Sequence, residues 1–361
     1  MKRNILLTTL LLTAFISYSM DAQSLLQKQK SAFMSDAFQL IGFGQAIWNF
    51  SEHTNSGIAK SPTNSTIELA RTILIANGKL GPNNQFGYSI MFDLGPNTAL
   101  HEVYGEWLPM DAINVRFGQF KIPFTIENPM APIAWETIYL SRSASAMCGS
   151  VGDYNQFGVD GPLGKSIVPK IGRDAGLQLS GKLFKKDNYF HLEYYAGLFN
   201  GTGMNTKDNN NHKDFVGTAY YQPIKDLRIG GSYYNGKLLY ALGEMPVANH
   251  TRDRFAVSAE YNSKYFYGRS EYIGAKDGEI NRNGFYCSAV WKFIPQKWEA
   301  VVKYDFYDKD MDISDNEVSD ITAGINFYFA LFSRIQLNYI YTDDKVLGKN
   351  NAVATQLQLF F

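Results

Sequence analysis

The last eleven residues of the chain read as one amphipathic β-strand that ends on an aromatic residue. Successive side chains of a strand point to opposite faces. In this segment Gln356 and Gln358 lie on one face, and the apolar residues lie on the other, namely Val353, Leu357, Leu359 and Phe361. Only helices and closed barrels can span lipid. A terminal strand of this kind therefore predicts that the rest of the chain closes into the same transmembrane barrel.

The first residues have the pattern of an export signal. Lys2 and Arg3 precede an apolar stretch over residues 5–16, and small residues follow it. Cleavage after Ser19 and cleavage after Ala22 both fit. No later run reaches the roughly 18 apolar residues that a transmembrane helix needs. The expected organisation is a signal peptide (1–22), a polar periplasmic leader (23–37) and a transmembrane β-barrel (38–361).

The composition suits a barrel and excludes a nucleic-acid partner. Basic and acidic residues balance at 34 each, so the chain lacks the basic surplus that binds phosphate backbones. Aromatic residues make up 15% of the chain, yet its mean hydropathy is below zero. Outer-membrane barrels combine these properties because they place apolar residues outward, polar residues inward and aromatic girdles at the interfaces.

From Phe38 onward, apolar and polar residues alternate with a period of two between turn residues. In the segment 320–329, for example, Ile321, Ala323 and Ile325 alternate with polar residues or glycine. An even number of strands is typical of bacterial single-chain barrels, and sixteen gives a bore wide enough for water. The pattern predicts sixteen strands, over 38–50, 66–76, 86–94, 100–108, 113–121, 174–184, 189–199, 214–222, 226–236, 252–262, 265–275, 284–294, 297–307, 319–329, 332–342 and 351–361.

The connections support this count, because barrel strands are joined alternately by short periplasmic turns and longer external loops. From the C-terminus backwards, short links at 330–331, 295–296 and 262–264 alternate with longer ones at 308–318 and 276–283. The alternation places both termini in the periplasm. It is weakest among the first four strands, where 77–85 is long for a turn and 95–99 is short for a loop.

The stretch 122–173 is the longest without a strand pattern. Loops of this length tend to be functional, and a sixteen-stranded barrel is much wider than a small solute. We expect this loop to fold into the bore and narrow it; an external lid is the alternative. The loop offers cations and acids for such a role, namely Arg142, Lys165, Lys170 and Arg173 against Glu127, Glu136, Asp153 and Asp160.

Charged residues in the strands share the face opposite the apolar one. Charges are costly toward lipid and tolerated in a wet lumen, so this face is expected to line water. Its two signs could pair with each other, and that interpretation stays open. The expected lumen residues are Arg116, Lys182, Arg228, Arg254, Arg269, Lys292, Lys303, Arg334, Asp93, Glu193, Glu260, Glu271, Glu299 and Asp305.

Three motifs resemble one family. Arg116–Phe124 (RFGQFKIPF), Asp174–Gly181 (DAGLQLSG) and Tyr195–Gly203 (YAGLFNGTG), the last followed by Lys213–Phe215 (KDF), are similar in order and spacing to segments of the phosphate-selective porin O and P family. The resemblance runs from about Phe38 to the C-terminus. It implies a sixteen-stranded, trimeric outer-membrane channel in which basic side chains conduct anions. This chain departs from that pattern, because 122–173 lacks a dense ladder of arginines and acids share the lumen face.

No chemistry-bearing motif points to an enzyme, a metal site or a cofactor. The five histidines form no zinc-binding pair, and Cys148 and Cys287 lack metal-ligand spacing. No nucleophile elbow, phosphate-binding loop or dinucleotide fingerprint occurs. Alternating aspartates at 308, 310 and 312 lack the Gly and Glu of a calcium loop and are read as a solvated loop.

The sequence therefore predicts an outer-membrane porin for passive diffusion of small anionic or neutral solutes, with lipid and lipopolysaccharide around it. A different class stays open: a surface-exposed structural or adhesive barrel with an occluded lumen, suggested by the apolar character of the loop at 237–251. Six residues are expected to line the pore and attract anionic solutes: Arg116, Arg142, Arg173, Arg254, Arg269 and Lys303.

Overall fold

The computed structural model describes residues 36–53, 62–96, 98–148, 172–240 and 248–361. The predicted signal peptide and nearly all of the leader lie outside these residues, so both stay predictions. The described residues contain sixteen β-strands. Their bounds are β1 Gln39–His53, β2 Pro62–Leu80, β3 Phe86–Asp93, β4 Ala99–Met110, β5 Ile113–Lys121, β6 Arg173–Lys186, β7 Tyr189–Phe199, β8 Asp214–Ile224, β9 Leu227–Tyr240, β10 Ala248–Asn262, β11 Phe266–Asp277, β12 Ile280–Ile294, β13 Trp298–Asp308, β14 Val318–Ala330, β15 Ser333–Asp344 and β16 Gly348–Phe360.

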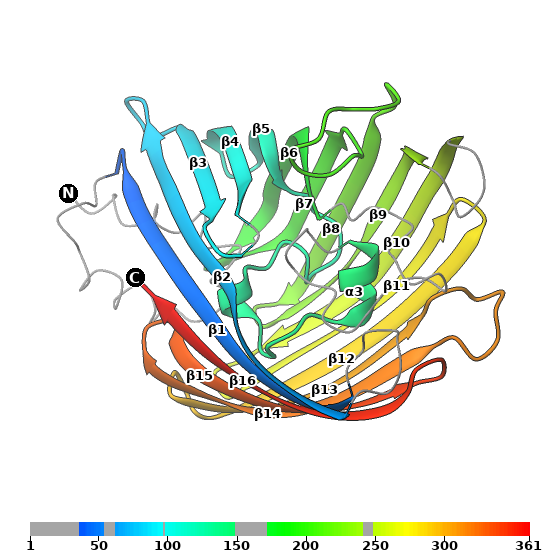
Figure 1. The fold of residues 1–361 in the computed structure, drawn as a ribbon. Helices are drawn as coiled ribbons and strands as arrows, with labels where there is room; N and C mark the ends of the chain where they lie inside the picture. The colour runs from blue at the N-terminus through cyan, green and yellow to red at the C-terminus, as the bar shows by residue number, and fades with distance from the viewer. Residues whose placement is uncertain (1–35, 54–61, 97, 149–171, 241–247) are drawn as a thin grey trace.

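The strands form one closed antiparallel barrel, which confirms the predicted fold class (Figure 1). Each strand pairs with its sequence neighbours, and β1 closes the ring by pairing with β16 from Phe43↔Phe360 to Ser51↔Ala352. Beyond β16, Phe361 exchanges two backbone hydrogen bonds with Gly42, at 2.7 and 2.9 Å. Closure leaves no unpaired sheet edge, which is the condition for a β structure in lipid.

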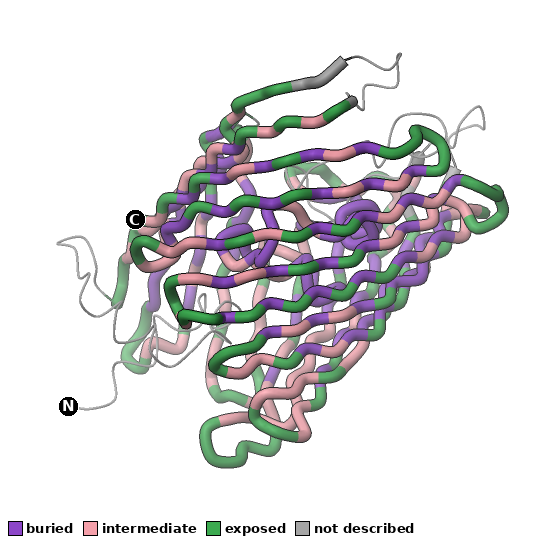
Figure 2. The backbone as a smooth tube through the Cα atoms, turned by 90° about the horizontal axis from the view of Figure 1, so that it is seen from below, coloured by how far each residue is buried: buried purple, intermediate pink, exposed green. Residues whose placement is uncertain are grey.

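Burial alternates residue by residue along the strands, as Figure 2 shows. Large apolar side chains on the outer face are open, with Ile67 at 77% and Phe117 at 72% exposed. Gln356 and Gln358, on the inner face of β16, are at most 1% exposed. The charged residues expected on the inner face are buried or half-buried inside the barrel and not open like the apolar residues of the outer face, which agrees with the predicted inward face. Such an outside suits lipid and not water.

The predicted strands have the correct order and number, but several of them are shorter than the strands in the structure. β2 runs from Pro62 to Leu80, beyond the predicted 66–76, and only 81–85 remains as the turn. β12 begins at Ile280, so the predicted external loop at 276–283 is a two-residue turn at Gly278–Glu279. Beyond the bilayer both faces of a strand meet water. The backbone ladder therefore continues where the alternation of hydrophobicity has already stopped.

The loop at 237–251 shows the same extension. β9 continues to Tyr240 and β10 begins at Ala248, while the intervening 241–247 lies outside the described residues. The adhesive interpretation rested on the apolar side chains of this loop, and most of them fall in that gap. The structure therefore gives it no support.

The long connection after β5 folds into the barrel, as expected (Figure 1). Its described part, 122–148, contains a 3-10 helix, η2 (Pro132–Ala134), and a short α-helix, α3 (Arg142–Met147). In the part of the chain that the structure describes, no helix has the length and apolar character needed to cross a bilayer.

Candidate functional site: a loop-narrowed bore

The loop after β5 crosses the inside of the barrel between walls that are far apart in the ring. It first follows β8, where Tyr220 donates a hydrogen bond to the carbonyl oxygen of Thr125 at 3.3 Å. It then reaches β11, where Glu271 accepts from the loop backbone at 2.9 Å. From there it crosses to β1, where the Gln45 amide donates to the carbonyl oxygen of Pro132 at 3.4 Å. Because β1 and β11 are not neighbours, the chain between these contacts spans the bore.

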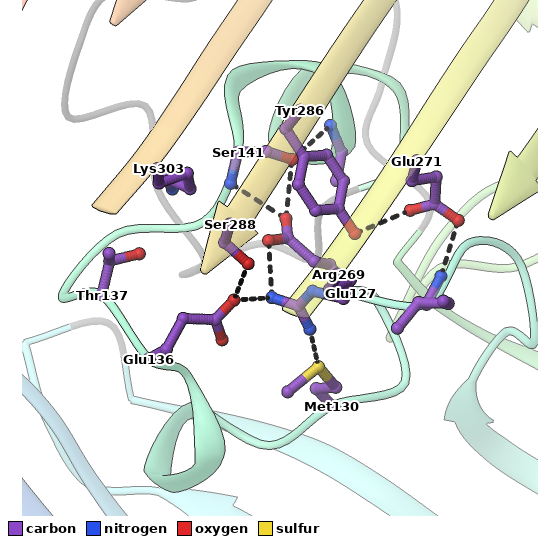
Figure 3. A network of polar contacts seen from close by, with 12 residues as sticks. Glu127, Met130, Glu136, Thr137, Ser141, Arg269, Glu271, Tyr286, Ser288 and Lys303 are labelled. Carbon is purple, nitrogen blue, oxygen red and sulfur yellow. Dashed lines mark hydrogen bonds and ion pairs between the residues drawn. The ribbon is translucent and has the colours of Figure 1, made fainter. Parts of the chain in front are cut away.

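Arg269 on β11 binds the loop at one residue before and one residue after its contact with β1. Its guanidinium donates to Glu127 at 3.0 Å and to Glu136 at 2.6 Å (Figure 3). Ser288 donates to the same Glu136 oxygen at 2.7 Å, and Ser141 donates its backbone amide to Glu127 at 2.9 Å. The three ionised side chains are only 1–2% exposed. We call Arg269, Glu127 and Glu136 the clamp.

We call residues 127–136 the arch; the two glutamates of the clamp are its end residues. Its tip, 129–134, reads Pro-Met-Ala-Pro-Ile-Ala and has no polar side chain. Ala131 and Ile133 are buried in a cluster with Phe43 and other apolar side chains of β1–β3. The arch is thus fixed by charge at its ends and by apolar packing at its tip.

Only three arch side chains are not buried. Pro129, Met130 and Ala134 are half-buried although they lie inside the barrel. Met130 marks the middle of the crossing, because Lys121 on β5 donates to its carbonyl oxygen at 2.7 Å and Arg269 on β11 touches its sulfur. The described acids of the arch are thus buried against Arg269, whereas three apolar residues of the arch keep partly accessible surface inside the barrel.

After the arch, the loop is docked on the wall of β12–β15 through α3. The Arg142 amide donates to Asp305 at 2.6 Å, and its guanidinium pairs with Asp320. α3 lies directly on the backbone of β12, because a Cβ atom added at Gly284 would be 2.2 Å from the Cβ of Ser143. Only glycine at 284 permits this approach.

Four of the six predicted pore residues hold the loop instead of lying open to the bore, each with 3% exposure or less; they are Arg142, Arg254, Arg269 and Lys303. Arg254 donates to the Met147 carbonyl oxygen and pairs with Asp277 at 2.6 Å. Lys303 donates to the Tyr139 carbonyl oxygen at 2.9 Å. The alternative that lumen charges pair with protein groups thus describes these four. A role in attracting solutes stays a prediction.

The other two predicted residues differ from each other. Arg173 is 3% exposed and pairs with Glu102 at 2.9 Å. Arg116 also has an acidic partner, Glu106 at 2.9 Å, but its side chain is 27% exposed. Its guanidinium lies over the ring of Tyr104, 4.3 Å from the centroid. Among the six, Arg116 is the one with an accessible charge.

Two more accessible cations lie on the same wall. Lys182 on β6 is 3.8 Å from Glu193, and Arg228 on β9 lies 3.5 Å from Glu193 and 3.4 Å from Glu260. Their side chains are 39% and 25% exposed, whereas the two glutamates are 20% and 9% exposed. In each pair, as in the Arg116 pair, the cation is the more open partner. We call Arg116, Lys182 and Arg228 the cation edge.

The alternation of residues placed Lys182 and Arg228 on the lumen face but did not single them out for the pore. The alternation of residues in a strand predicts which face of the sheet a side chain lies on, but it does not predict whether a loop covers that side chain. The roles of Glu127 and Glu136 were missed as well, since both were expected only as acids that the loop could present. Their position on either side of an uncharged run was the available signal. The other loop charges, Lys165, Lys170, Asp153 and Asp160, lie outside the described residues.

The clamp gives the loop a defined dependence on pH. Burial alone would raise the pKa of Glu136, but Arg269 and the hydrogen bond from Ser288 outweigh it and hold the pKa below the ordinary value of 4.5. A carboxyl group with a lowered pKa stabilises the docked loop above its ordinary pKa. That contribution disappears as the pH falls through the lowered value.

We therefore expect the contribution of Glu136 to loop docking to be constant from pH 7 to about 5 and to be lost below about pH 4, with a rise in single-channel conductance. Conductance recorded against pH in the unaltered protein and in Glu136→Gln tests this, because the variant should lack this part of the acid transition. An acid transition that is identical in the two proteins would contradict this role of Glu136.

A closed sixteen-stranded barrel, apolar outside and narrowed by an inward loop, has the architecture of an outer-membrane porin. The comparison with protein families agrees: residues 231–361 match the model described as "Phosphate-selective porin O and P". This confirms the similarity to that family in the C-terminal part, whereas the three motifs between 116 and 215 lie outside the match. No curated protein sequence matches the chain.

Solved structures of porins share the whole fold. The anion-selective porin from Comamonas acidovorans is 14% identical with a TM-score of 0.66, over 90% of this chain and 99% of that one. OmpF of Salmonella typhi, in complex with daunomycin, is 11% identical with a TM-score of 0.63, over 90% and 97%. OmpT of Vibrio cholerae is 13% identical with a TM-score of 0.60, over 91% and 99%. At these identities the likeness concerns the fold alone.

Proposed function

We propose that this outer-membrane porin passes small hydrophilic solutes by passive diffusion and prefers anions. The observation that carries the preference is the cation edge, where the positive member of each ion pair is more exposed than its carboxylate. Accessible charges of one sign raise the local concentration of the opposite ion and bias permeation. The nearby acids make the expected preference moderate.

Planar bilayers test this proposal directly. The purified protein should give stable open steps, and under a salt gradient the reversal potential should have the sign of an anion-preferring channel. Steps with a cation-signed reversal potential would remove the anion preference and leave a general porin. Folded, membrane-inserted protein that gives no steps would contradict the porin and favour the occluded barrel.

Neutralising the cation edge should weaken the preference. For Lys182→Gln we expect the chloride-to-potassium permeability ratio to fall about twofold at low salt, and less at high salt, because the charge is partly solvated and screened. Lys186→Gln is the matched control, since Lys186 is exposed at the end of the same strand beside the turn. Equal ratios for the two variants would show that the lumenal charge of Lys182 does not act on permeating ions.

Two finer features are proposed from the similarity to the phosphate-selective porin O and P family. One is a specific response to phosphate, which titration of phosphate into a chloride current would reveal as block at low concentration. The other is a homotrimer embedded in lipid and lipopolysaccharide, which mass measurement of the detergent-solubilised protein before and after heating would reveal.

A further inference from the structure

The two sides of the narrowed bore are chemically unlike, and we propose that they select small organic anions that carry an apolar or aromatic face. The inference rests on the proposed anion-preferring porin and names the class of solute that its bore favours. A carboxylate attached to a hydrocarbon or ring is the simplest member of this class.

The first side is the arch. Pro129, Met130 and Ala134 keep part of their surface accessible inside the barrel, although the Met130 sulfur contacts Arg269, and the described acids of the arch are buried in the clamp. A constriction segment that only needed to narrow a water-filled bore could carry polar side chains at these positions. Apolar side chains that stay accessible at a narrow point lower the free energy of solutes that can cover them.

The second side is the wall that bears the cation edge. The glutamates at both ends of the arch bind Arg269 on β11, and the tip of the arch packs against β1–β3. In the ring of strands, β4–β10 therefore lie on one side of the arch. The cation edge belongs to β5, β6 and β9, so it lies on that side.

The register of the strands and two side-chain contacts place the clamp and part of the cation edge in one band. Arg269 lies opposite Glu260, and Glu260 lies opposite Arg228. On the next strands Tyr220 lies opposite Glu193, and Glu193 lies opposite Lys182. Arg228 joins these residues through its ion pair with Glu193 and its contact with the Tyr220 ring, and not through the register. Cross-strand partners are about 5 Å apart, so Arg269, Arg228 and Lys182 belong to one band, whereas Arg116 lies opposite Gln178, outside it.

Aromatic rings contact both guanidinium groups of the cation edge. The guanidinium of Arg228 lies 4.4 Å from the centroid of the Tyr220 ring, and that of Arg116 lies 4.3 Å from the centroid of Tyr104. Both guanidinium groups are thus held by rings and by glutamates, Arg116 between Tyr104 and Phe120, while their side chains stay 27% and 25% exposed. A permeating anion therefore meets planar donors that are held in place.

A small inorganic anion gains from the cations alone, and there the neighbouring glutamates offset much of the attraction. Contact with the arch would cost such an ion part of its hydration without return. An organic anion gains on both sides, because its carboxylate meets the cation edge while its apolar part covers the arch.

Block of the chloride current in planar bilayers tests the inference with matched probes at neutral pH: acetate, benzoate and inorganic phosphate as anions, and benzamide as the uncharged ring. We expect benzoate to block at concentrations about tenfold lower than acetate, with phosphate and benzamide weaker than benzoate. Met130→Gln should narrow the gap between benzoate and acetate, and Met130→Leu should keep it. Lys182→Gln should weaken both carboxylates by the same factor.

Equal block by acetate and benzoate would overturn the inference, and so would block that follows charge alone, with phosphate strongest. A gap that is unchanged in Met130→Gln would also overturn it, because the arch would then have no part in the discrimination. These results would leave the porin intact, since open steps and the reversal potential are recorded in the same experiment before any probe is added. A protein without open steps would instead remove the proposed function and the inference together.

Discussion

Replacing Arg269 with methionine is expected to release the arch and raise single-channel conductance. The substitution removes the only positive member of the clamp and leaves Glu127 and Glu136 buried with no cation between them. Removing one partner of a buried ionic set costs about 3–5 kcal/mol. We expect this cost to weaken the docking of the arch and not the folding of the barrel, because β11 keeps its backbone hydrogen bonds to both neighbouring strands.

Cys148 provides a second measurement of the same event. Its side chain is fully buried behind α3, and burial raises the pKa of its thiol well above the ordinary value. In a Cys287→Ser background, which removes the exposed thiol, a maleimide should label Cys148 slowly when the arch is docked. It should label Cys148 quickly in the Arg269→Met variant.

The matched control replaces the whole clamp. In a triple variant with Arg269→Met, Glu127→Gln and Glu136→Gln, no buried charge is left uncompensated, and such replacements are often neutral or stabilising. Conductance and Cys148 labelling should return toward the unaltered values. If Arg269→Met alone leaves both unchanged, the apolar tip holds the arch and the clamp does not.

The architecture was accessible to sequence reasoning because lipid restricts the solutions so strongly. Once Val353, Leu357 and Leu359 define an outward face, a spanning strand must belong to a closed barrel, and turn spacing then gives strand number and rim. The residues of the bore were less accessible. Arg269 and Lys182 both lie on the inward face, yet one is buried under the loop and the other is open. That difference depends on where Glu127 and Glu136, which precede Arg269 by 142 and 133 residues in the sequence, are docked.

One local feature of the sequence indicated that the loop after β5 docks inside the barrel. An uncharged run at 129–134, bounded by Glu127 and Glu136, cannot be a solvated external loop without exposing apolar surface. The pattern was compatible with an inward position, but it did not name Arg269 as the partner. In a barrel every inward cation satisfies the same alternation, so the choice among them is made by packing at β1–β3 and β12. No short-range pattern records that packing.

Gly284→Ala is expected to undock α3 from β12 and increase conductance, by less than Arg269→Met. The added methyl group would lie 2.2 Å from the Ser143 Cβ and 2.9 Å from the Phe306 carbonyl oxygen, so the helix must move. Overpacking of this kind costs about 1–3 kcal/mol. Gly44→Ala is the matched control, because the corresponding methyl group has nothing within 4 Å.

A second substitution distinguishes undocking from general damage to β12. Ser143→Gly removes the atom that the new methyl group meets, and among the described residues the Ser143 hydroxyl has no hydrogen-bond partner whose loss would confuse the result. In the Gly284→Ala/Ser143→Gly double variant, Cys148 labelling and conductance should move back toward the unaltered protein. The loss of docking free energy in the double variant should therefore be smaller than the sum of the losses in the two single variants. Additive effects of the two substitutions would mean that α3 and β12 are not in contact where Gly284 places them. Restoration would show that a single glycine in the wall sets how closely the loop lies against it, and so how wide the bore is.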